Sequence, residues 1–226
     1  HILLIDYAEN TAVMDEIGRL RELTFRLVGE GTGQSKDIDQ FDHYYRHLLL
    51  WDDDRLEIAG AYRLGEIWRW QGQPKTKLYS QSLFDYQPSI QPLFAQGLEL
   101  GRSFVQPQYW GRRSLDYLWQ GIGAYLASHP QVRYLFGPVS LSNNMPKPAR
   151  DMLVHFYETH FADPDHFALP AIPYVIDADS AADLRQHMPG LDFDMDHKWL
   201  RSQLGFMGLK IPTLFKQYAD VCTPGG

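Results

Sequence analysis

The chain has 226 residues, of which 44% are hydrophobic and 22% charged, and its formal net charge is −7 at pH 7. This length fits one large domain or two small ones, and the acidic balance argues against bulk nucleic-acid binding, which needs a basic surface. The single cysteine excludes an internal disulfide and is typical of the reducing cytoplasm, where we expect the protein to be.

The first half of the chain alternates between extended and helical patterns. Residues 2–5 predict a strand, and residues 15–28 carry apolar side chains at helical spacing, which predicts an amphipathic helix. The expected buried face of this helix consists of Ile17, Leu20, Thr24, Leu27 and Val28. Residues 44–51 and 56–64 predict two strands joined by an acidic turn, and residues 66–70 should continue the second strand.

The second half begins with a strand, predicted over residues 98–105, and a helix over residues 114–128 that Ser114 can cap. Gly121 and Gly123 each cost this helix about 1 kcal/mol, which indicates close packing on a sheet. A buried strand is expected over residues 134–139 and a helix over residues 146–161. Residues 162–197 should be loop with short helices, before segments 200–209 and 212–220 close the chain.

Charged residues interrupt these apolar patterns and predict a buried lattice of ions. Arg21 lies beside the apolar stripe of the first helix, and a buried guanidinium must be paired because an uncompensated buried charge costs several kcal/mol. Its candidate partners are Asp37, Asp39, Asp42 and Glu99. Arg63 and Arg102 would join the lattice from two strands on one side of a sheet. One interpretation is that this lattice only fixes the helix to the sheet. The other is that it recognises an amino acid, whose ammonium the carboxylates would hold and whose carboxylate the arginines would hold.

A tight turn follows the strand over residues 98–105. It reads Gln108-x-x-Gly111-x-Arg113, and a helix opens at Ser114. A strand, turn and helix in this order direct several free backbone N–H groups and the positive end of the helix at one place, where a phosphate can bind. The candidate phosphate-binding residues, which would hold a cofactor or its phosphate arm, are therefore Gln108, Gly111, Arg112, Arg113 and Ser114.

These motifs resemble those of a known superfamily. The turn is similar to the Gln/Arg-x-x-Gly-x-Gly/Ala signature of the Gcn5-related N-acyltransferases. The charged positions of the related acyl-homoserine-lactone synthases resemble Arg21, Asp39-x-x-Asp42, Arg63 and Glu99-x-x-Arg102. A closer similarity, over residues 1–220, is to the ornithine-lipid (hemolysin-like) N-acyltransferases. They share the order of segments that resemble Glu99–Val105, Leu118–Gly121, Phe136–Ser140 and Pro212–Tyr218.

The resemblance implies the acyl-CoA N-acyltransferase fold, an α/β (α+β) architecture with a mixed, twisted sheet flanked by helices on both faces. We expect one domain over residues 1–226, cut at both ends because the chain begins inside the strand expected over residues 2–5 and ends just after a helical segment. The resemblance supports the cut at the C-terminus. The implied reaction moves a fatty, 3-hydroxyacyl group from acyl carrier protein to the α-amine of an amino acid such as ornithine, giving a lyso-aminolipid. No permanently bound cofactor or metal is implied. A peripheral contact with the inner face of the membrane would suit such a product.

One departure from the signature bears on the donor. Arg113 stands where the signature has Gly or Ala, which disfavours the usual grip on a pyrophosphate. The acyl-phosphopantetheine of acyl carrier protein, with one phosphate on its arm, is therefore expected as donor, and acyl-CoA is the alternative.

The chemistry assigns roles to the candidate residues. Acyl transfer from a thioester to an amine needs a neutral amine, a polarised carbonyl and a stabilised thiolate. Glu99 is the candidate base with Arg102 beside it, and Tyr157 is either a proton donor to the thiolate or a core tyrosine. Arg21, Asp39, Asp42 and Arg63 would bind the acceptor.

Two alternatives stay open. The chain could be a signal synthase of the homoserine-lactone type, or a non-catalytic acyl-carrier or lipid-binding module of a larger lipid enzyme. The joint presence of Glu99, Arg102 and the turn argues against a loss of catalysis.

Overall fold

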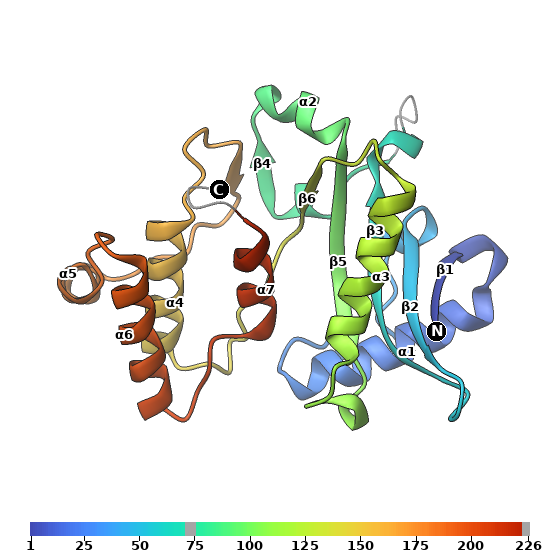
Figure 1. The fold of residues 1–226 in the computed structure, drawn as a ribbon, viewed down its shortest axis with the longest axis horizontal. Helices are drawn as coiled ribbons and strands as arrows, with labels where there is room; N and C mark the ends of the chain where they lie inside the picture. The colour runs from blue at the N-terminus through green and yellow to red at the C-terminus, as the bar shows by residue number, and fades with distance from the viewer. Residues whose placement is uncertain (71–75, 223–226) are drawn as a thin grey trace. The chain divides into compact units, whose positions relative to one another are not determined.

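A five-stranded sheet in the order β1-β2-β3-β5-β6 carries the elements that bear the candidate residues (Figure 1). Its strands are β1 (Ile2–Asp6), β2 (Arg46–Asp52), β3 (Glu57–Glu66), β5 (Gly97–Val105) and β6 (Tyr134–Phe136). Neighbouring strands are antiparallel except β5 and β6, which are parallel. The predicted mixed sheet is therefore confirmed.

The computed structural model describes residues 1–70 and 76–222, which fall into two units. Unit 1 contains residues 1–83 and 88–138, and unit 2 contains residues 84–87 and the chain from residue 139 onward. The single domain expected over residues 1–226 stays a prediction. No helix within residues 1–70 and 76–222 is long and apolar enough to cross a bilayer.

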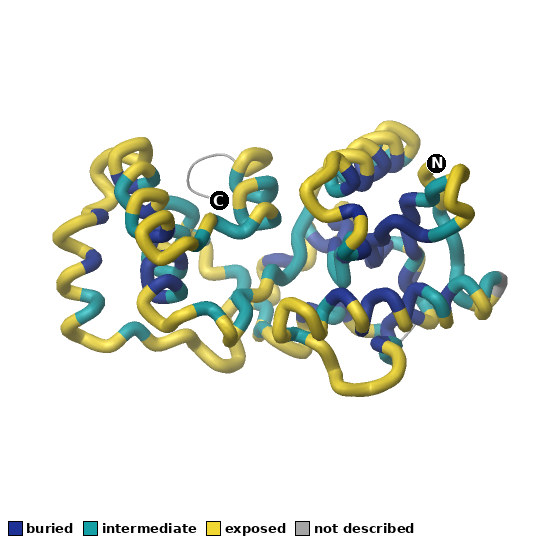
Figure 2. Tube along the Cα trace, turned by 90° about the horizontal axis from the view of Figure 1, so that it is seen from below, coloured by how far each residue is buried: buried dark blue, intermediate teal, exposed yellow. Residues whose placement is uncertain are grey.

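In unit 1 the helices α1 (Thr11–Leu27) and α3 (Ser114–Ser128) cover opposite faces of the sheet, with the buried strands between them (Figure 2). α1 packs Met14, Ile17 and Leu20 against Leu49 and Phe104. It begins four residues earlier than predicted because Met14, which is fully buried, extends the apolar stripe by one turn. The predicted burial of Leu27 and Val28 is wrong, since Leu27 is 58% and Val28 40% exposed.

The parallel pairing of β5 with β6 is short. It joins Gly97 to Tyr134 and ends where Glu99 meets Phe136. A Cβ on Gly137 would lie 1.9 Å from the carbonyl oxygen of Leu100, so only glycine permits this approach. The strand predicted over residues 134–139 instead ends at Phe136, so within the described residues β6 pairs with β5 only as far as Glu99.

Local corrections apply to two other segments. Residues 67–70 form a 3₁₀ turn, Ile67–Trp70, instead of continuing β3, and the indole N–H of Trp70 donates to the carbonyl of Tyr44. The short helix α2 (Gln91–Phe94) precedes β5.

Unit 2 combines four helices with a two-stranded sheet. The helices are α4 (Lys147–His160), α5 (Ala178–His187), α6 (Phe193–Phe206) and α7 (Thr213–Val221), and β4 (Phe84–Tyr86) pairs with β7 (Ala168–Pro170). Its core contains Leu153, Phe156, Leu200 and Leu204. α6 begins earlier than predicted, inside the expected loop, because the carboxylate of Asp192 caps its first turn by accepting from the N–H of Met195.

The two glycines of α3 give a matched test of its packing. A Cβ on Gly121 would lie 2.9 Å from Cγ2 of Ile2 and 3.2 Å from Cδ2 of Leu48, whereas a Cβ on Gly123 meets nothing within 4 Å. We expect Gly123→Ala to raise the free energy of unfolding by about 1 kcal/mol through helix propensity. Gly121→Ala should lose this gain to the crowding against the sheet. Urea unfolding measures both variants, and equal stabilisation would contradict the packing.

Candidate active site

Charged side chains from α1, β3 and the connection before β2 meet on the α1 face of the sheet. Arg21 makes a two-pronged contact with Asp42, with Nη1–Oδ1 at 3.0 Å and Nη2–Oδ2 at 2.8 Å. Nη1 of Arg63 donates to Oδ1 of Asp42 at 3.1 Å and to Oδ1 of Asp39 at 2.7 Å. Arg21, Asp42 and Arg63 are each at most 1% exposed, and we name these three the buried lattice.

Local sequence holds the two carboxylates before the arginines reach them. Asp39 precedes a 3₁₀ turn, Gln40–His43, and its Oδ1 accepts the N–H groups of Phe41 and Asp42. In return, Oδ2 of Asp42 accepts the N–H of Asp39 at 2.8 Å. The spacing Asp39-x-x-Asp42 thus forms a reciprocal capping box that fixes both side chains.

Neighbouring carboxylates complete the charge balance of the buried lattice, because Oδ2 of the buried Asp37 lies 3.2 Å from Nε of Arg21 and Asp39 pairs with Arg63. Burial alone would raise the pKa of Asp42, but the hydrogen bond and charge of Arg21 and the charge of Arg63 outweigh it and hold that pKa far below the usual range. The guanidinium of Arg63 also lies 5.1 Å from the ring centres of Tyr45 and Tyr79. These three charges therefore fix α1 to the sheet, and they are too deeply buried to meet a substrate without rearrangement.

Two members of the predicted set are exposed, and we name them the rim pair. Arg102 is 21% and Asp39 24% exposed, and Nη2 of Arg102 lies 3.5 Å from Oδ2 of Asp39. Nη1 of Arg102 lies equally far, 3.5 Å, from Oδ2 of Asp37. Both contacts are long for an ion pair, and partly exposed pairs of this kind contribute little to stability. The rim pair can therefore separate at low cost to bind a carboxylate and an ammonium.

A β-bulge brings Arg102 to this face. Ala61 pairs with Phe104 and Arg63 with Gly101, so Arg102 and Ser103 together oppose a single residue, Tyr62. In a regular strand, Glu99 and Arg102 would point to opposite faces, because side chains alternate. The extra residue, with Arg102 at a left-handed φ of 48°, turns the arginine toward Asp37 and Asp39.

Glu99 has different partners from those expected. In the described chain its Oε1 accepts the N–H of Ser80 at 2.8 Å, and its Oε2 accepts the N–H of Tyr79 at 3.2 Å and the hydroxyl of Tyr45, instead of pairing with Arg21 or Arg102. Glu99 lies opposite Gly65, where a Cβ would be only 2.6 Å from the ring of Tyr45. The missing side chain at position 65 thus admits Tyr45, and the carboxylate is 1% exposed.

The predicted donor turn has the expected order of elements. Gly111 adopts a left-handed φ of 74°. Ser114 is the first residue of α3 and Arg113 holds the N-cap position, so the expected capping role of Ser114 is wrong. The first hydrogen bond of the helix runs from the N–H of Tyr117 to the carbonyl of Arg113, which leaves the preceding N–H groups of residues 114–116 directed at the turn. Gln108 instead bonds to the β2–β3 hairpin, donating to Glu57 and accepting from Arg55.

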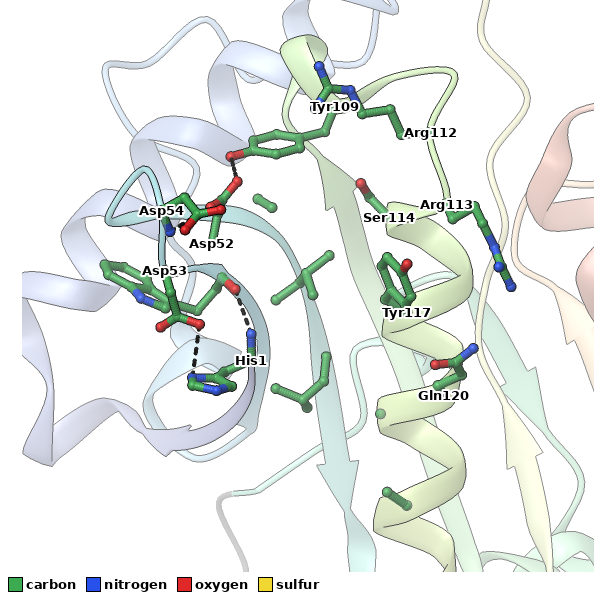
Figure 3. A pocket seen from close by; sticks show the side chains of 16 residues that line it. His1, Asp52, Asp53, Asp54, Tyr109, Arg112, Arg113, Ser114, Tyr117 and Gln120 are labelled. Atoms are coloured by element: carbon green, nitrogen blue, oxygen red, sulfur yellow. Dashed lines mark hydrogen bonds and ion pairs between the residues drawn. The ribbon is translucent and has the colours of Figure 1, made fainter.

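A pocket of roughly 880 Å³ lies beside this turn (Figure 3). Ser114 and Tyr117 of α3 face the acidic turn, residues 52–54, across it, and Arg112 and Arg113 contribute to its wall. Among the described residues, Gln108, Gly111 and Glu99 lie outside its lining. We would expect the donor site at the turn to open toward the candidate base Glu99, but this pocket opens on the α3 face whereas Glu99 points to the α1 face.

Tyr157 belongs to unit 2. Its ring lies 5.0 Å from that of Phe215 and 5.3 Å from that of Phe156, beside the core of that unit. Burial, with a smaller contribution from the charge of Asp220, raises the pKa of Tyr157 to about 12. The hydroxyl therefore keeps its proton at neutral pH, and its role as a proton donor stays a prediction.

Sequence reasoning missed two aromatic residues of the site, Tyr45 and Tyr79. The ring of Tyr79 lies 5.1 Å from the guanidinium of Arg63 and 5.0 Å from that of Arg102. Tyr45 was part of an expected strand, and Tyr79 follows a segment without apolar periodicity. Only the pair Tyr44-Tyr45 next to a charged strand could have indicated an aromatic cluster.

Comparisons with known proteins agree with the predicted class. The acetyltransferase (GNAT) domain family matches residues 20–120. A glycine N(alpha)-acyltransferase of Bacteroides thetaiotaomicron is 35% identical over 97% of this chain and 69% of its own length. An L-ornithine N(alpha)-acyltransferase of Brucella abortus is 30% identical over 68% of this chain and 59% of its own. Among solved structures, a CoA-dependent acyl-homoserine lactone synthase, MesI, is 17% identical over 67% of this chain and 76% of that one, with a TM-score of 0.44.

His47 gives the lattice a measurable pH dependence. Burial lowers its pKa to about 4, against the attraction of Asp42. Because the unfolded chain protonates histidine near pH 6.5, the stability that neutral His47 provides is complete above that pH and is lost as the pH falls from 6.5 toward 4. This shift corresponds to about 3 kcal/mol. We expect His47→Gln, which can still donate to the carbonyl of Asp42, to remove that part of the acid destabilisation in urea unfolding at several pH values.

The exposed neighbour His43 supplies the control. His43→Gln should leave the wild-type pH dependence of stability unchanged, because this side chain is exposed at the end of the 3₁₀ turn. If the wild-type protein and His47→Gln lost stability in parallel between pH 7 and pH 4, His47 would have no such role.

Proposed function

Because this chain belongs to the family of GNAT-domain N-acyltransferases that includes the glycine and L-ornithine N(alpha)-acyltransferases, we propose that it moves a fatty acyl group from acyl carrier protein to the α-amine of glycine. The acyl group in this proposal is a 3-hydroxyacyl chain, and the product is a lyso-aminolipid. The observation that carries the proposal is the rim pair, a partly exposed arginine and aspartate with only long contacts to each other.

The rim pair matches the charges of an amino acid. Arg102 offers N–H donors in a fork that suits a carboxylate, and Asp39 offers an acceptor for an ammonium. The guanidinium of Arg102 lies 5.0 Å from the ring centre of Tyr79 and 6.0 Å from that of Phe25. Glycine is favoured as acceptor because the glycine-specific relative matches 97% of this chain and the ornithine-specific relative 68%.

The beginning of α3 suits the donor. The N–H groups of residues 114–116 and the positive end of the helix favour an anion there, and Arg112 and Arg113 add positive charge to an acidic protein. A phosphopantetheine arm carries one phosphate, which fits a turn whose signature ends in arginine. Arg112 and Arg113 would also attract an acidic carrier protein, against the repulsion of the acidic turn, residues 52–54, across the pocket.

The proposed transfer forms one bond and breaks one. The neutral α-amine attacks the thioester carbonyl, so that a C–N bond replaces the C–S bond. The ammonium first loses one proton to water, the nitrogen loses a second proton as the amide forms, and the departing thiolate gains one.

An acceptor panel tests the proposal. The purified chain is incubated with 3-hydroxyacyl-carrier thioester and with glycine, alanine, serine, ornithine or lysine, and products are identified by mass spectrometry. We expect N-acylglycine as the main product, because the rim pair provides for one carboxylate and one ammonium. Preferred acylation of ornithine would replace the acceptor within the same class. Thioester consumption without any acylated amino acid would contradict the proposed function.

Charge reversal at the turn tests the donor. We expect the double change Arg112→Glu and Arg113→Glu to raise the KM for the carrier thioester by about tenfold at low salt, and less at high salt because salt screens exposed charges. The KM for glycine should not change. Arg19→Glu, which alters an exposed arginine on α1, is the matched control. Equal rates with coenzyme-A and carrier thioesters at equal concentration would refute the carrier as donor.

A further inference from the structure

Residues 77–80 are fastened to the sheet by hydrogen bonds from aromatic and acidic side chains. The hydroxyl of Tyr44 donates to the carbonyl of Lys77 at 2.8 Å. The N–H of Tyr79 donates to the hydroxyl of Tyr45 at 2.8 Å and to Oε2 of Glu99 at 3.2 Å, and the N–H of Ser80 donates to Oε1 of Glu99 at 2.8 Å. One carboxylate thus holds two consecutive backbone amides.

The contacts of Glu99 argue against direct proton transfer from the acceptor. Its oxygens accept from Tyr45, Tyr79 and Ser80, and its side chain is 1% exposed. To reach an α-amine, it would have to give up these bonds and expose buried N–H donors, each of which costs about 1–3 kcal/mol when left unsatisfied. The influence of Glu99 on the site therefore passes through the residues that it holds.

Tyr79 connects this fastening to the rim pair. Its ring is partly exposed and lies over both guanidinium groups, 5.0 Å from Arg102 and 5.1 Å from Arg63, and it meets the ring of Phe41 edge-on at 5.5 Å. The attraction between this ring and the cation of Arg102 helps to hold the guanidinium in place. Tyr79 is therefore an aromatic side chain that an amino acid bound at Arg102 would meet beside the guanidinium.

We infer that Tyr79 selects the acceptor by size and orients Arg102, and that Glu99 is a positioning residue that acts through Tyr79. This inference rests on the proposed function and names the residues that restrict it to glycine. Neither role requires Glu99 to exchange a proton with the substrate.

A double-mutant cycle of Glu99→Gln and Tyr79→Ala tests the inference. In Glu99→Gln an NH₂ group replaces one of the two oxygens that accept the backbone N–H groups of Tyr79 and Ser80. Because an NH₂ group cannot accept a hydrogen bond, one of these bonds is lost and residues 77–80 are held less tightly. We expect each single variant to raise the KM for glycine by about 10-fold, the effect of losing one hydrogen bond to a charged group, with kcat changed less. The KM for glycine of the double variant should be no higher than that of the more impaired single variant, because both changes remove the same positioning.

Two further readouts separate positioning from general structure. Tyr79→Phe keeps the ring and should behave like the wild-type protein. Tyr79→Ala should raise the rate with alanine and ornithine relative to glycine, which a merely destabilised protein would not do. The pH dependence of kcat should be the same in Glu99→Gln as in the wild-type protein.

The opposite results would overturn the inference. If Glu99 were the general base, Glu99→Gln would lower kcat by about 10²- to 10⁴-fold at an unchanged KM for glycine, and its effect would multiply with that of Tyr79→Ala. If Glu99→Gln does not fold, as judged by circular dichroism, the acceptor range of Tyr79→Ala decides, and unchanged selectivity refutes the role of Tyr79. A wild-type protein that acylates no amino acid would instead overturn the proposed function itself.

Discussion

The pairing of Asp42 with two buried arginines is the interaction on which the rest of unit 1 depends. Asp42 is fully buried and receives Arg21 from α1 and Arg63 from β3, so one carboxylate joins a helix and a strand that are far apart in sequence. Loss of that carboxylate would leave Arg21 with the buried Asp37 and Arg63 with the partly exposed Asp39, and breaking a buried ion pair typically costs about 3–5 kcal/mol. The capping box with Asp39 places Asp42 for this task by local geometry alone.

The same lattice joins a structural part to a part open to solvent. Its buried members cannot touch a ligand, whereas Arg102 and Asp39 at its edge hold each other only at 3.5 Å. Fixing the helix to the sheet and recognising an amino acid are therefore not exclusive alternatives. The deep ion pairs make the arrangement rigid, and this rigidity would keep the rim pair oriented for the zwitterion that we propose as acceptor.

The sheet separates the two proposed substrates. The turn before α3 and its pocket lie on one face, and the rim pair lies on the α1 face. Strand β5 belongs to both, because it ends at the turn and carries Glu99 and Arg102 in its middle. Within the described residues, the pairing of β5 with β6 ends at Glu99. We propose that the reaction takes place along the edge of β5 beyond this point, where reactants from the two faces of the sheet can meet.

The sequence by itself determined what depends on neighbours along the chain. The helix over residues 114–128 and the strand before it follow from apolar periodicity and turn residues, and a buried Arg21 required acidic partners by charge alone. Only the tertiary structure decided which face Arg102 occupies and what Glu99 binds. The bulge in β5 arises from its register with β3, and Tyr45 and Tyr79 come from 54 and 20 positions away in the chain. Periodicity within one strand carries no information about the face of Arg102 or the partners of Glu99, because both depend on how separate segments pack together.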